Sequence, residues 1–100
     1  MKYQFQAGFW WDNGCAGYSP DPFEAESIDE VCNKVISQMR EDTNALHAED
    51  FSLEVYDEND NEVLWFGYDV KLRKNVLYNE EEEMLNELRK ELKEEVFKDE

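Results

Sequence analysis

Apolar and polar side chains alternate regularly between residues 2 and 11. Successive side chains of a β-strand point to opposite faces, so this period of two predicts a strand with one buried face. The residues predicted to face the core are Tyr3, Phe5, Ala7, Phe9 and Trp11. Trp10 must then point to the other face, because neighbours on a strand cannot both enter one core.

A turn and a weaker second strand are expected next. Asn13 and Gly14 tolerate positive φ, so residues 12–15 predict a chain reversal before a strand over residues 18–25. Pro20 and Pro22 have no backbone N–H group to donate to a neighbouring strand. This second strand is therefore expected at an edge of the sheet.

The residues SIDE at positions 27–30 have the pattern of a capping box, which predicts the start of a helix. Apolar residues then recur at helical spacing, so a helix that lies on the sheet is expected to about residue 41. Its apolar stripe consists of Ile28, Val31, Cys32, Val35, Ile36 and Met39. The polar segment that follows predicts a connection that can include a short turn of helix.

Alternation returns at residues 51–57 and 62–70, and the polar residues DEND between them favour a turn. These two segments predict a β-hairpin with Glu54 and Tyr56 on its outer side. Residues 71–78 have no clear pattern and allow a longer strand, a short strand or irregular structure. Asn79 with Glu82 repeats the capping pattern and predicts a final helix to about residue 97.

The predicted order is strand, strand, helix, strand, strand, helix. This order is typical of a two-layer α+β sandwich with an antiparallel four-stranded sheet and two helices. A chain of 100 residues suits one domain, so a single domain is expected over residues 1–100.

Charge limits the classes of partner. The formal net charge is -16, and residues 1–70 hold 16 acidic and 3 basic side chains, whereas residues 71–100 hold 10 and 7. Such a surface repels nucleic acid and anionic membranes, since both are bound through lysine and arginine. It attracts the basic surface of another protein. The alternative is that the charge serves only solubility.

Two groups of residues are candidates for partner binding. The first is an outer aromatic patch of Trp10, Tyr56 and Trp65, bordered by Gln4, Gln6 and Glu54, because exposed aromatic residues with a polar rim are typical of protein contact sites. The alternative is that the final helix covers this face and makes the aromatic residues part of the core. The second group is one acidic face of the final helix, formed by Glu80, Glu83, Glu87, Glu91 and Glu94.

Nothing in the sequence predicts catalysis, a cofactor or a metal site. His47 is the only histidine, and phosphate-binding loops and nucleophile motifs are absent. Residues 57–62 resemble a calcium loop in part, but Glu62 stands where such a loop needs glycine. No apolar segment is long enough for a membrane span or a signal peptide, so a cytoplasmic, non-enzymatic protein is expected.

The leading functional hypothesis is a small acidic protein that occupies a basic site on a partner protein, including a site built for nucleic acid. Acids one turn apart on the final helix would then imitate the phosphates of a strand. In composition the chain is similar to inhibitors of host nucleases encoded by phages and mobile elements. The alternative is a structural or regulatory homodimer, and residues 18–31 resemble the strand-to-helix passage of HicB-like antitoxins, without the glycine–cysteine turn of that family.

Overall fold

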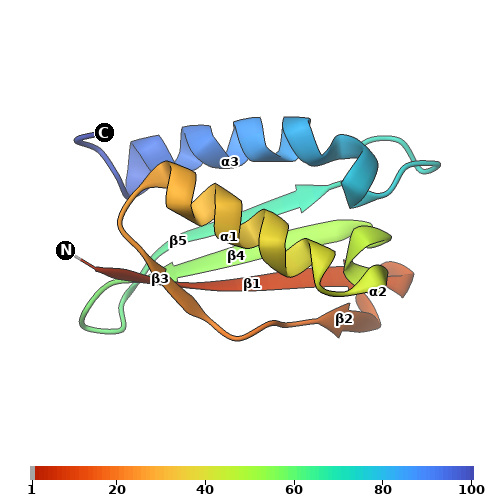
Figure 1. Cartoon of the computed structure of the whole chain (residues 1–100), viewed down its shortest axis with the longest axis horizontal. Helices are drawn as coiled ribbons and strands as arrows, with labels where there is room; N and C mark the ends of the chain where they lie inside the picture. The colour runs from red at the N-terminus through yellow and green to blue at the C-terminus, as the bar shows by residue number, and fades with distance from the viewer. Residues whose placement is uncertain (1) are drawn as a thin grey trace.

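The computed structural model describes residues 2–100 and shows an antiparallel sheet packed against two long helices (Figure 1). The strands are β1 (Tyr3–Trp11), β2 (Ala16–Tyr18), β3 (Phe23–Ala25), β4 (Asp50–Tyr56) and β5 (Glu62–Asp69). The helices are α1 (Ile28–Arg40), the short α2 (Thr43–Leu46) and α3 (Glu81–Glu95), and 3-10 turns cover Asp12–Gly14 and Leu77–Glu80. The predicted α+β class, with an antiparallel sheet and two main helices, is confirmed.

The strands lie in the order β2, β1, β4, β5, and β3 pairs with β1 on the same side as β2. β2 pairs with the end of β1 at residues 9–11, and β3 pairs with its beginning at residues 3–5. The prediction of one strand over residues 18–25 is therefore wrong in detail, since this edge is split in two. The cause is Pro20 and Pro22, which cannot donate to a ladder.

The connection between β2 and β3 is held by two glutamine side chains. Gln6 Nε2 donates to the carbonyl of Pro20 at 2.8 Å, and Gln38 Nε2 donates to the carbonyl of Asp21 at 3.0 Å. These bonds satisfy carbonyl groups that the interrupted strand does not pair with a neighbour. The bonds and the prolines together fix this edge of the sheet.

The core lies between one face of the sheet and the helices α1 and α3. Phe5 and Phe9, which the alternation assigned to the core face, are 0% exposed, and Phe51 of β4 is 1% exposed beside them. α3 contributes Met84, Leu88 and Leu92 to the same cluster, and it also contacts α1. The alternative in which the final helix covers the second sheet face is therefore wrong.

The two long helices begin differently. Ser27 caps α1 as predicted, because its Oγ accepts the N–H of Glu30 at 3.2 Å. The predicted cap of the final helix is wrong: Asn79 lies within the preceding 3-10 turn, and among residues 2–100 no side chain caps α3. Glu80 stands at the cap position instead, and its carboxylate is turned toward the loop after β5. Residues 71–76 form turns and no strand.

The remaining connections agree with their turn chemistry. Asp57 Oδ1 accepts the N–H groups of Asn59 at 2.8 Å and Asn61 at 3.0 Å, which closes the turn between β4 and β5. The polar connection after α1 includes one turn of helix, α2. In the described range 2–100, no helix combines the length and apolar character that a membrane crossing requires.

Candidate functional site

The second face of the sheet is open, because α1 and α3 both pack on the first (Figure 1). Every second side chain of β1, β4 and β5 points to this open face. The structure places Trp10, Tyr56 and Trp65 there together, as the alternation predicted, with Gln4, Gln6 and Glu54 among them. The role of these residues in binding stays a prediction.

Trp10 lies flat against the open face over two glycines. A Cβ atom at Gly17 would stand 2.2 Å from Trp10 Cε3, and one at Gly8 would stand 2.7 Å from Cζ2. The indole Nε1 donates to Ser52 Oγ at 3.0 Å. The glycines on β1 and β2 leave room for the ring to lie on the sheet, and the hydrogen bond to Ser52 on β4 fixes its orientation. The same bond satisfies the indole N–H group.

Substituting Gly17 by alanine should lift the Trp10 ring off the sheet, because the new methyl group would overlap the indole. We expect a loss of about 1–3 kcal/mol in the free energy of unfolding. Thermal unfolding followed by circular dichroism measures it. Gly14→Ala, in the neighbouring turn, is a contrasting change. An added Cβ atom at Gly14 meets no heavy atom of the described residues within 4 Å, so its only cost is backbone strain at a φ of +85°. A Gly17→Ala protein as stable as the native one would show that the ring is free to move.

Trp65 and Tyr56 extend the aromatic surface across β4 and β5. The Trp65 ring also lies over a glycine, since a Cβ atom at Gly67 would stand 2.5 Å from its Cη2. Trp65 is nevertheless 61% exposed, and it is opposite Glu54 in the ladder. Tyr56 donates its hydroxyl to the Glu54 carboxylate, and this hydrogen bond raises the pKa of Tyr56 to about 12. The sheet therefore holds the Trp65 and Tyr56 rings in fixed positions, which lowers the entropy lost when a partner binds them.

The open face is acidic as well as aromatic. None of the five strands contains a lysine or an arginine. Lys2, next to β1, forms an ion pair with Glu24 at 3.8 Å. The strands bring Glu24, Glu54, Asp50 and Asp69 into one sheet without a basic residue of their own. Glu24 is compensated by Lys2, so a cationic group on the open face would meet chiefly the carboxylates of Glu54, Asp50 and Asp69.

Asp50 and Asp69 are directly opposite each other on β4 and β5. A hydrogen bond with Asp69, partial burial and the negative charge of Asp69 raise the pKa of Asp50 to about 6. Trp10 is opposite Asp50 on the other side of β4. The pair thus lies in the same row of the sheet as the Trp10 indole.

Replacing Asp50 by asparagine should stabilise the protein above about pH 6. The folded protein holds the Asp50 proton more tightly than the unfolded chain, so the free energy of unfolding of the native protein falls as pH rises through about 6. Because the pair is mostly exposed, the gain should be below about 1 kcal/mol. Urea unfolding at about pH 5 and about pH 8 measures it. An equal effect at both pH values would contradict the raised pKa of Asp50.

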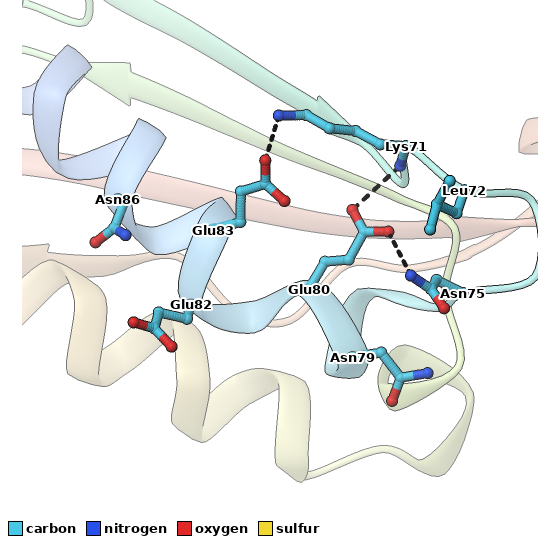
Figure 2. Close-up of a pocket in the computed structure, with 8 residues that line it drawn as sticks. All are labelled: Lys71, Leu72, Asn75, Asn79, Glu80, Glu82, Glu83 and Asn86. Carbon is cyan, nitrogen blue, oxygen red and sulfur yellow. Dashed lines mark hydrogen bonds and ion pairs between the residues drawn. The ribbon is translucent and has the colours of Figure 1, made fainter.

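Glu80 is buried, so the prediction that it belongs to the exposed acidic face of the final helix is wrong. The residue is 7% exposed, and its carboxylate accepts from Tyr68 Oη at 2.7 Å. It also accepts from Lys71 N at 3.1 Å and from Asn75 Nδ2 at 3.1 Å (Figure 2). These bonds, that from Tyr68 foremost, lower the pKa of Glu80 to about 2. Glu80 therefore ties the loop after β5 to the start of α3.

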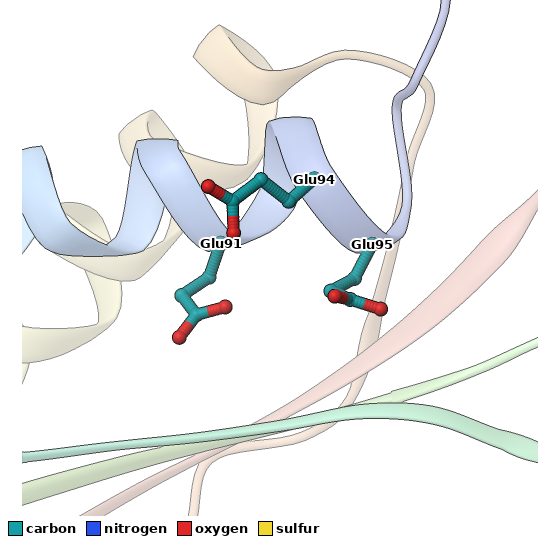
Figure 3. A group of neighbouring side chains, drawn as sticks. All are labelled: Glu91, Glu94 and Glu95. Carbon is teal, nitrogen blue, oxygen red and sulfur yellow. The ribbon is translucent and has the colours of Figure 1, made fainter.

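The other predicted acids of α3 divide into two groups. Glu83 and Glu87 form ion pairs with Lys71, the second at 3.4 Å. Glu91 and Glu94 lie near Glu95, and the three carboxylates are within 4.8 Å of one another (Figure 3). The continuous line of charge predicted for this helix is thus interrupted, because its first half is buried or neutralised. The open sheet face is the stronger candidate site.

Comparisons with known proteins add no functional information. The sequence matches no known protein family, no curated protein and no solved structure.

Proposed function

We propose that this is a small acidic binding protein without catalytic activity, whose open sheet face occupies a basic surface of a partner protein. The observation that carries the proposal is the combination of Trp10, Tyr56 and Trp65 on strands that contain no lysine or arginine. Trp and Tyr supply much of the energy of protein interfaces, and the carboxylates around them select a cationic partner.

The most specific version of this proposal is that the partner is a nucleic-acid-binding protein and that its nucleic-acid site is the surface occupied. Such a surface presents lysine and arginine at the positions where phosphates would lie, and it is wide enough to receive a sheet face. The carboxylates of Glu54, Asp50 and Asp69 would take the places of phosphates, while the indole rings take apolar contacts. The protein would then act as an inhibitor that mimics nucleic acid, in the manner expected of a phage or mobile-element product.

Affinity capture with matched baits tests this proposal. The native protein and a Trp10→Ala/Trp65→Ala double variant are immobilised and exposed to the same cell lysate at low and high salt. We expect nucleic-acid-binding proteins on the native bait at low salt, with strong losses at high salt and on the double variant. Equal recovery on both baits, or recovery that salt does not change, would refute the proposal.

The competing role is a structural or regulatory homodimer that pairs through the same open face. Two copies would each bring a formal charge of -16, which opposes such contact. Sedimentation velocity over a wide range of concentration and salt separates the two roles. The binding role predicts a monomer at low salt, whereas a dimer that persists at all salt concentrations would favour the competing role.

A further inference from the structure

The two edges of the sheet are built differently. The edge formed by β2 and β3 is short, interrupted by Pro20 and Pro22, and held by Gln6 and Gln38. The opposite edge is β5, a continuous strand of 8 residues. In the part of the chain that the structure describes, no strand pairs with the outer side of β5. Free strand edges are sites where an extended chain can add to a sheet.

The hydrogen-bond pattern identifies which backbone groups of β5 point outward. Val70 N donates to the carbonyl of Glu49 at 2.9 Å, and these residues continue the register in which Asp69 is opposite Asp50. Hydrogen-bonded and non-bonded pairs alternate along an antiparallel ladder. The residues that direct their N–H and C=O groups away from β4 are therefore Trp65, Gly67 and Asp69.

An extended segment of a partner that approached this edge would meet apolar and acidic side chains, because β5 contains no lysine or arginine. Trp65 is 61% exposed in the middle of β5, and its ring lies over Gly67 on the open face. α3 packs near β5, and Glu91 and Glu95 project from that helix on the side of the sheet (Figure 3). Lys71, just beyond β5, is already paired with Glu83 and Glu87.

We propose that the partner contributes an extended basic segment that adds to the sheet as a further strand beside β5. Its backbone would pair with the outward groups of Trp65, Gly67 and Asp69, and its basic side chains would meet carboxylates on both sides of the sheet. The occupant is not a second copy of this chain, because β5 carries acidic and no basic residues and two copies would repel each other. This inference rests on the proposed function and specifies the form of the partner.

A synthetic peptide provides the probe. It alternates lysine and valine over 8 residues, the length of β5, with blocked ends. Its matched control has the same side chains and charges but N-methylated backbone amides, which cannot donate to a strand. We expect the control to bind at least about tenfold more weakly, because the backbone bonds supply affinity in strand addition.

Amide hydrogen exchange measured by NMR locates the contact. In the complex, the amides of Trp65, Gly67 and Asp69 should become protected, whereas those of Phe66 and Tyr68 should be protected already in the free protein. Protection of the three outward amides in the free protein at high concentration would instead indicate self-association through β5 and would overturn the inference.

The remaining outcomes separate this inference from the proposed function. If peptide and control bind equally, without protection of the outward amides, strand addition is refuted while docking on the open face stands. If neither peptide binds at low salt, strand addition is refuted, and the proposed function is decided separately by affinity capture with the native and Trp10→Ala/Trp65→Ala baits. As a second test, Glu91→Gln/Glu95→Gln should weaken peptide binding about threefold, and more than the control pair Glu82→Gln/Asp99→Asn, which removes the same charge elsewhere.

Discussion

Replacing Trp65 by alanine should weaken binding of the basic partner by about 30-fold or more, because truncation of a central tryptophan typically costs 2 kcal/mol or more. The free energy of unfolding should fall by at most about 1 kcal/mol, since the Trp65 side chain is 61% exposed and lies outside the core. Isothermal titration of the partner captured by the native bait measures the affinity. Urea unfolding of the free variant measures its stability.

Two other exposed side chains provide matched controls. Leu72 is 64% exposed and Tyr78 is 53% exposed, yet neither belongs to a strand of the open face. Leu72→Ala and Tyr78→Ala should therefore change the affinity less than threefold or so. A loss of affinity shared equally by all three variants would indicate general hydrophobic adhesion, and it would contradict a site on the open face.

Replacing the buried Glu80 by alanine should lower the melting temperature more than the same change at any exposed glutamate of residues 81–95. The change removes the acceptor of three hydrogen bonds and leaves the Tyr68 hydroxyl buried without this partner. We expect the melting temperature to fall by roughly 10 °C. Scanning calorimetry measures the fall, and Glu82→Ala, at an exposed position of the same acidic run, should leave the melting temperature nearly unchanged.

The pH dependence of the same contact has a defined direction. Because folding lowers the pKa of Glu80 to about 2, its contribution to stability is present above pH 4.5 and is lost as pH falls toward 2. The native protein and Glu80→Ala should therefore approach each other in stability in acid. A difference between the two proteins that stays constant from neutral pH to about pH 2 would show that the carboxylate charge is irrelevant.

The alternation of side chains was sufficient to predict most of the open face. Trp10, Tyr56 and Trp65 sit in segments with a clear period of two, and the face of a strand residue is determined by its neighbours in the sequence. The covering of one face by both helices was not predictable, because the apolar stripe of a helix shows that it packs but does not show on which side of the sheet. The glycines beneath the tryptophan rings depend in the same way on register across strands.

Glu80 shows where local pattern misleads. By helical spacing it joins Glu83 and Glu87, and only the course of the loop after β5 brings its carboxylate to Tyr68. One signal was present in the sequence: Tyr68 falls on the core face of its strand, and a buried hydroxyl needs a hydrogen-bond partner. The opposition of Asp50 and Asp69 was likewise hidden, since residues so far apart in sequence meet only through the register of the hairpin.

The three tryptophans allow a direct test of where the partner binds. Each indole N–H gives its own NMR signal, Trp10 and Trp65 lie on the open face, and Trp11 is packed against the core on the other side. On titration of the labelled protein with its basic partner, the signals of Trp10 and Trp65 should shift while that of Trp11 stays in place. A shift of Trp11 without the other two, or shifts confined to α1 and α3, would contradict binding through the open face.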